Sequence, residues 1–142
     1  MVSESVLLFS TLSFVVQLVV LGLLIFGYFL KRMRKFRQHG MTMTVAVFLH
    51  LVTVFSWMIR SFVSYFGSVS FNFGDLLILV TLAHVAFGVF AASFGVWLVA
   101  SWHLKKDISK CFTRKRIMLT TITLWLTAIA LGFVLYVSIV LS

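Results

Sequence analysis

The chain of 142 residues contains no proline and a single cysteine, Cys111. Proline is a common cause of sharp kinks in helices, so its absence predicts straight helices. One cysteine cannot form a disulfide within the chain, and the basic segment around it implies none with a partner. The sequence also lacks the CxxC motif of a redox site.

Carboxylates are scarce, because the chain has three acidic residues against twelve basic ones. They are Glu4, Asp75 and Asp107, and all three lie outside the long apolar runs. A ferritin-like metal site needs several carboxylates in the core of a helix bundle and is therefore excluded. The sequence has no paired nucleophile and base and no glycine-rich phosphate loop. We therefore expect the protein to have no catalytic activity of its own.

Long apolar runs dominate what remains. Hydrophobic residues make up 62% of the chain, against about 45–50% in soluble domains. Four runs reach the ~20 residues that a helix needs to cross the ~30 Å of a bilayer core. They predict a single transmembrane domain, an all-α integral membrane protein in contact with the lipid bilayer. The predicted spans are Val6–Leu30, Met41–Phe66, Leu76–Trp102 and Ile117–Leu141.

The net charge of +9 comes from basic residues that flank these spans. All but Arg60 lie in residues 31–37 and 105–116, which excludes a nucleic-acid interface and predicts that both segments face the cytoplasm. Residues 67–74 and both termini are then outside, in a multi-pass protein of the cell (plasma) membrane. The short connections predict an antiparallel up-down-up-down bundle.

Two histidines, His50 and His84, lie deep inside predicted spans. Each is about nine residues from one end of its span, which at ~1.5 Å per residue is roughly 14 Å of depth. Both imidazoles are therefore expected near the midplane, on antiparallel helices. This is the ligand arrangement of a bis-histidine haem b. We predict that they bind haem iron, with Gly88 leaving room for the porphyrin. The aromatic residues expected to line its slot are Phe48, Phe55, Trp57 and Phe87.

The same two histidines are explained equally well as buried neutral side chains that bond the backbone or a hydroxyl, such as that of Thr53 or Thr81. Another metal or a proton path is a further alternative. His39 and His103 are weaker candidates for metal ligands, because their position beside the basic segments favours interfacial residues.

Arg60 lies near the outer end of the second span, where a long side chain can extend its charge to the surface. We expect it to snorkel, with Asp75 as partner; the alternative is contact with a haem propionate or a quinone headgroup. Asp75 is expected to begin the third helix, where a carboxylate suits the positive end of the helix dipole. The third span also carries small residues that predict close helix packing, namely Gly88, Ala91, Ala92 and Gly95.

Two stretches carry a family resemblance. Residues 38–43 read QHGMTM and follow a basic segment, and residues 117–136 contain TLWL and then a glycine four residues before Tyr136. Together they resemble the CtaM/YozB-like family of small bacterial and archaeal membrane proteins, over residues 36–136. The resemblance implies a four-helix membrane protein that serves the maturation of haem-copper terminal oxidases.

Within this resemblance, His39 and His84 stand where the family has histidines. Arg60 stands at a family arginine, but Ser61 replaces the histidine that follows it. The family histidine of the last basic segment is also missing, near Arg114. His50 and His103 lie outside the pattern.

These observations predict a small membrane subunit or assembly factor of a respiratory-type electron-transfer system, with haem b between the second and third spans. Its expected partners are a larger membrane complex or further copies of the chain, and a quinone. The alternative is a cofactor-free structural subunit of a larger membrane oxidase or oxygenase.

Overall fold

The computed structural model describes residues 4–68, 75–105 and 114–141. In these ranges the chain forms helices and short turns, with no strand. Four helical stretches are long and apolar enough to cross a membrane, which confirms the prediction of an all-α four-helix membrane protein. The elements are α1 (Glu4–Arg32), α2 (Phe36–Thr53), the π-helical turn η1 (Val54–Met58), α3 (Ile59–Ser68), α4 (Leu76–Lys105) and α6 (Lys115–Leu141).

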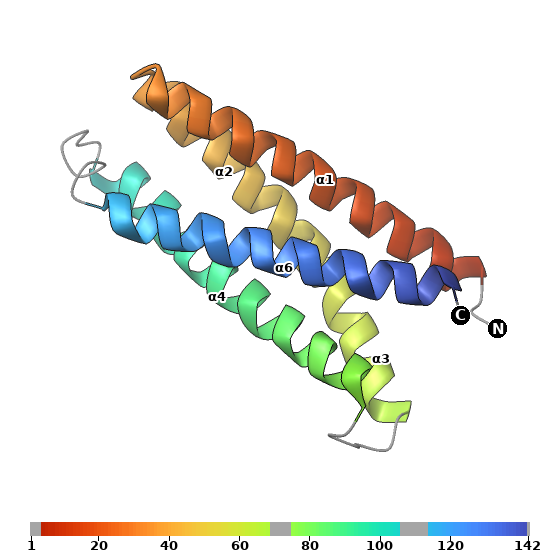
Figure 1. The fold of residues 1–142 in the computed structure, drawn as a ribbon. Helices are drawn as coiled ribbons and strands as arrows, with labels where there is room; N and C mark the ends of the chain where they lie inside the picture. The colour runs from red at the N-terminus through yellow and green to blue at the C-terminus, as the bar shows by residue number, and fades with distance from the viewer. Residues whose placement is uncertain (1–3, 69–74, 106–113, 142) are drawn as a thin grey trace.

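The helices form the expected up-down-up-down bundle, and Figure 1 shows it as two antiparallel hairpins. Helix α1 packs along α2, and α4 packs along α6. Smaller contacts of α1 with α6, and of α2 with α4, join the two hairpins into one bundle. The second span is continuous through α2, η1 and α3.

The turn between α1 and α2 ends the first helix without a glycine. Arg34 has a left-handed backbone, with φ of 60°. Its N–H donates to the carbonyl of Lys31, and the N–H of Lys35 donates to that of Leu30, both at 3.0 Å. This pair of bonds is a Schellman motif, in which glycine usually holds the left-handed position. An arginine there keeps the turn basic at some cost in backbone strain.

The second span departs from the straight helix that the absence of proline predicted. In η1 the N–H of Ile59 donates to the carbonyl of Val54, five residues earlier, so the turn is wider than an α-turn. A π-turn bends or rotates a helix by accommodating an extra residue, and it requires no proline. Within this turn, Trp57 stacks on Phe9 of α1, with ring centroids 4.5 Å apart.

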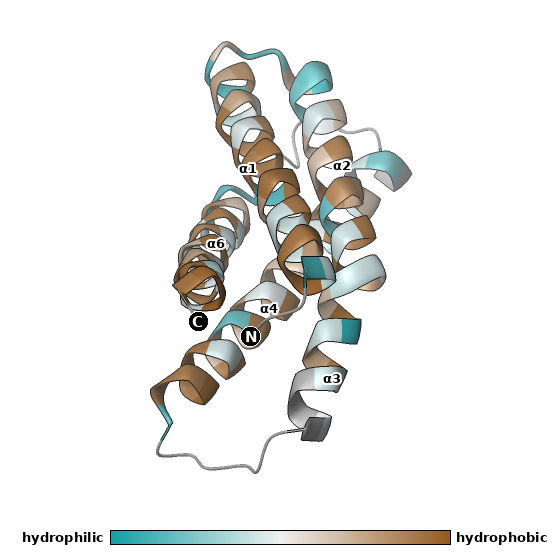
Figure 2. Cartoon of the chain, turned by 90° about the vertical axis from the view of Figure 1, so that its right-hand side faces the viewer, coloured by the Kyte–Doolittle hydropathy of each residue, from teal (hydrophilic) through white to brown (hydrophobic). Residues whose placement is uncertain are grey.

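The spans are apolar along most of their length (Figure 2). The bundle buries a narrow core and exposes many large apolar side chains. Leu8, Phe48 and Phe55 are 67%, 64% and 68% exposed, which suits contact with lipid. The outward position of Phe48 and Phe55 also shows that the prediction of a haem slot lined by these two rings is wrong. The buried core cluster consists of Val20, Leu24, Ala46, Val47, Ala91 and Trp125.

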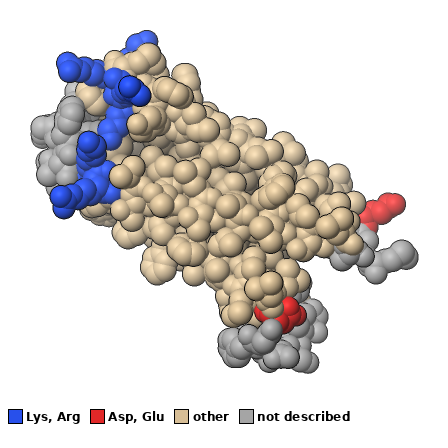
Figure 3. Space-filling view, in the orientation of Figure 1, with Lys and Arg blue, Asp and Glu red and all other residues tan. Residues whose placement is uncertain are grey.

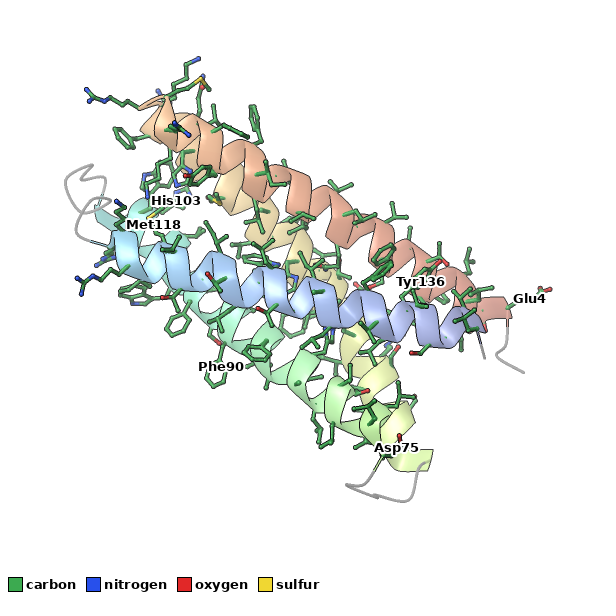
Figure 4. The ribbon with its side chains drawn as sticks, viewed as in Figure 1. Glu4, Asp75, Phe90, His103, Met118 and Tyr136 are labelled. Carbon is green, nitrogen blue, oxygen red and sulfur yellow. The ribbon has the colours of Figure 1, made fainter. Side chains whose placement is uncertain are left out.

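Charge is separated along the bundle (Figure 3). The described Lys and Arg side chains apart from Arg60 gather at the end where α1 turns into α2 and where α6 begins, which we call the basic end. Glu4 and Asp75 lie at the opposite end, on two separate arms of the surface (Figures 3 and 4). The arms are formed by α1 with α6 and by α3 with α4 (Figure 1).

Candidate functional site

His50 is buried between the two hairpins, with 5% of its side chain exposed. Its Nδ1 lies 3.2 Å from Oε1 of Gln17 on α1. Because that amide oxygen only accepts, Nδ1 carries the proton and Nε2 is left as an acceptor. Nε2 is buried and has no hydrogen-bond partner among the described residues. The imidazole packs against the Trp125 ring of α6, with centroids 4.8 Å apart.

His84 links the other hairpin in the same manner. Its Nδ1 donates to the backbone carbonyl of Ala128 on α6, at 2.8 Å. Gly132 provides the space, since a Cβ there would lie 2.9 Å from Cε1 of His84. Ala128 and Trp125 are three residues apart on α6, so they occupy neighbouring positions on one helix face. His84 and His50 therefore reach α6 within one turn of each other.

His39 repeats the pattern near the basic end. It is 5% exposed, and its Nδ1 donates to the carbonyl of Gly27 on α1 at 2.7 Å. The absence of a side chain at Gly27 lets Met43 approach as well, since a Cβ there would lie 2.5 Å from the Met43 methyl group. Each of these three histidines, of which His39 and His50 are buried and His84 is half-buried, thus donates its Nδ1–H to the partner helix of its own hairpin.

This shared pattern has two chemical meanings. A histidine that ligates a metal usually donates its other ring N–H to an acceptor, which fixes the free nitrogen as the ligand. Hydrogen bonds from histidine across membrane helices also hold helices together without any metal. In the described part of the chain, no three side chains of His, Cys, Asp or Glu converge on one point as a metal cluster would need.

His103 and Arg60 lie away from this interior. His103 is exposed at the basic end (Figure 4), with Nε2 3.2 Å from the hydroxyl of Thr44. Arg60 is exposed on α3. Asp75, its expected partner, instead accepts a hydrogen bond from the N–H of Leu77 at 3.0 Å and so caps α4. Among the described residues no ion pair joins Arg60 to Asp75.

Gly88 does not occupy a packed slot, because a Cβ there would have no atom within 4 Å. The close approach of α4 occurs further along the helix, at Ala91 and Gly95, which are both buried. A Cβ at Gly95 would lie 3.2 Å from Val47 and 3.3 Å from the Trp125 ring. The expected close packing at small residues therefore occurs at Ala91 and Gly95 and does not occur at Gly88.

The ring nitrogens of His50 and His84 are of the kind that ligates haem iron, and both rings have close neighbours on α6. A cavity of about 110 Å³ lies between the helices on the basic side, and neither histidine lines it. Sites for ligands of drug size measure roughly 300–1,000 Å³. Trp125 fills the space beside His50, and Gly88 contributes no cradle.

Sequence reasoning missed three residues that shape this interior, Gln17, Trp125 and Gly132. Gln17 had a signal, since it is the one amide side chain in the apolar run 6–30. Polar side chains at membrane depth are costly and therefore point to a partner. Trp125 and Gly132 entered only as parts of a family motif, and nothing in the sequence says which histidine they face.

None of the protein-family models, curated proteins and solved structures compared with the chain matches it. The resemblance to the CtaM/YozB-like family therefore stays a prediction.

Proposed function

We propose that this protein is a small accessory subunit or assembly factor of a respiratory-type electron-transfer system, without catalytic activity of its own. The observation that carries the proposal is the hydrogen bonding of the three interior histidines, His39, His50 and His84. Each donates its Nδ1–H to a hydrogen bond within its own hairpin, and such bonds hold the two helices of a hairpin together. The respiratory setting rests on the residues that resemble the CtaM/YozB-like family.

In this proposal the basic end faces the cytoplasm of the cell, and both termini face outside. The separation of charge supports it, because Lys and Arg gather on the cytoplasmic side of membrane proteins. The described part of the chain places the α1–α2 turn and the start of α6 at the same end (Figure 3).

The proposed partner is a larger membrane complex, which would contact the apolar outer surface. Exposed aromatic rings such as Phe48 and Phe55 offer area for helix packing as readily as for lipid. The alternative is assembly with further copies of the same chain. The mass of the purified protein distinguishes this homo-oligomer from a complex with other subunits.

Haem b held by His50 and His84 is the second candidate function. The buried and unpartnered Nε2 of His50 favours it, since a lone pair without a partner in the interior suits an axial ligand. A haem with two imidazole ligands would supply one-electron transfer. His50 and His84 would hold it, and their bonds to Gln17 and Ala128 would fix which nitrogen faces the iron.

A visible spectrum of the purified protein tests both candidates. A Soret band lost in both His50→Ala and His84→Ala, but kept in His103→Ala, would establish the haem site. A colourless protein that copurifies with subunits of a terminal oxidase would support the accessory subunit. A colourless protein that purifies alone, from cells whose oxidase assembles normally without it, contradicts both.

A further inference from the structure

The cavity of about 110 Å³ has a lining of mixed chemistry. Its walls come from all four spans and are mostly apolar, with two indole rings and two thioethers. Polar groups are few, and they include the imidazole of His39 and the guanidinium of Arg114 at the basic end. The residues that decide its character are His39, Met43, Trp102, Arg114, Met118 and Trp125. Figure 4 shows Met118 at the basic end of α6.

Among the polar groups that line this cavity are the imidazole of His39 and the indole of Trp125, whose Nε1 is buried and has no hydrogen-bond partner among the described residues. The His39 side chain is 5% exposed, and its Nδ1–H donates a hydrogen bond to the carbonyl of Gly27. Nε2 is therefore a hydrogen-bond acceptor, and no described residue donates to it. A ligand that meets His39 here has to bring a donor, such as a hydroxyl group.

The volume sets the size of the ligand. An engineered apolar cavity of about 150 Å³ binds one benzene molecule. A cavity of about 110 Å³ is on the scale of a single six-membered ring and is far too small for a porphyrin. Indole faces and methionine sulfur are favourable neighbours for such a ring.

We propose that this cavity binds a hydroxylated aromatic ring, of the phenol or hydroquinone class, whose hydroxyl donates a hydrogen bond to Nε2 of His39. The oxidised quinone form has no hydroxyl and loses this bond. The proposal requires neither a haem nor a partner protein, and it shares with the proposed function only the bond of His39 to Gly27.

Phenol and methoxybenzene form a matched pair of probes, because they share the ring and only phenol can donate. The protein in micelles, labelled with ¹⁵N at its tryptophan indoles, reports binding at separate positions. Phenol should shift the signals of Trp102 and Trp125, which line the cavity, and leave Trp57 unchanged. Methoxybenzene should bind roughly three- to tenfold more weakly, the value of one net hydrogen bond.

The variant His39→Phe keeps a ring but removes the acceptor, so phenol should bind it no better than methoxybenzene. His103→Phe is the control, because His103 is exposed and does not line the cavity. Equal binding of the two probes to the parent protein would overturn the role of His39, even if the variant did not fold. Shifts at Trp57 alone, or at no indole, would overturn the site.

Discussion

His84 on α4 rests against Gly132 on α6, and the missing side chain of the glycine is what lets the imidazole reach the carbonyl of Ala128. A Cβ at residue 132 would lie 2.9 Å from Cε1 and 3.3 Å from Nδ1 of His84. The hydrogen bond that the glycine permits is 2.8 Å long. The close packing of His84 and its hydrogen bond to Ala128 therefore both depend on Gly132.

Gly132→Ala should destabilise the protein by about 1–3 kcal/mol, because the added methyl group overpacks the contact and displaces His84. The free energy of unfolding in mixed micelles measures the effect. Gly88→Ala is the matched control, since a Cβ there meets no atom within 4 Å. Equal stability of the two variants would show that α4 and α6 do not meet at His84.

The apolar runs predict the four spans and their antiparallel order. They do not predict the residues at which each helix begins and ends. Helix α2 begins at Phe36, whereas the apolar run begins at Met41. Arginine and lysine are good helix formers, so the helices continue through the basic interface where hydropathy already falls. The π-turn at Val54–Met58 has no proline or glycine within it, and hence no sequence signal.

The candidate site was predictable only in part. Depth along the helix placed His50 and His84 inside the bundle, because rise per residue is fixed. Packing against neighbours decides where along one face a helix is covered, since Gly88 faces open space while Gly95, seven residues further on, meets Trp125. Packing also sets the rotation of each helix about its own axis. The same rotation paired His50 with Gln17.

The bond between Gln17 and His50 should appear as a coupling energy in a double-mutant cycle. Gln17→Leu and His50→Phe each leave a buried polar partner unpaired, so the double variant should cost less than the sum. Hydrogen bonds between membrane helices couple by about 0.6 kcal/mol on average and at most about 1.7. Chemical unfolding of the four proteins gives the value.

Gln17→Leu combined with His39→Phe is the control pair. His39 lies eleven residues from His50 along the same span, roughly 16 Å at helical rise, and bonds Gly27 instead. These two changes should add within about 0.3–0.5 kcal/mol. Additivity of the Gln17 and His50 changes within the same margin would mean that no bond forms between them.

Gly40→Ala should loosen the contact between the two hairpins. A Cβ at Gly40 would lie 2.5 Å from Cε2 of Trp102, so the indole has to shift. We expect a loss of about 1–3 kcal/mol in unfolding free energy and a changed tryptophan emission spectrum. Gly22→Ala is the control, because a Cβ at Gly22 meets nothing within 4 Å. An unchanged spectrum for Gly40→Ala would contradict the packing of Trp102 on α2.

The orientation in the membrane is open to a labelling experiment that uses the only cysteine of the chain. Cys111 lies outside the described residues, in the basic segment that is expected to face the cytoplasm. An impermeant maleimide added to intact cells should leave Cys111 unlabelled, and permeabilised cells should show full labelling. The physical reason is the cost of moving a strongly basic segment across the bilayer, which fixes it inside.

A second cysteine tests the opposite end. In a Cys111→Ser background, Glu4→Cys places the thiol at an exposed position at the start of α1, far from the basic end (Figure 4). It should react with the impermeant reagent in intact cells. Labelling of Cys111 but not of Cys at position 4 would invert the proposed topology, and would place both termini in the cytoplasm. Labelling of both thiols in intact cells would mean that the reagent had entered through damaged membranes. Labelling of a cytoplasmic marker protein in the same cells detects such damage.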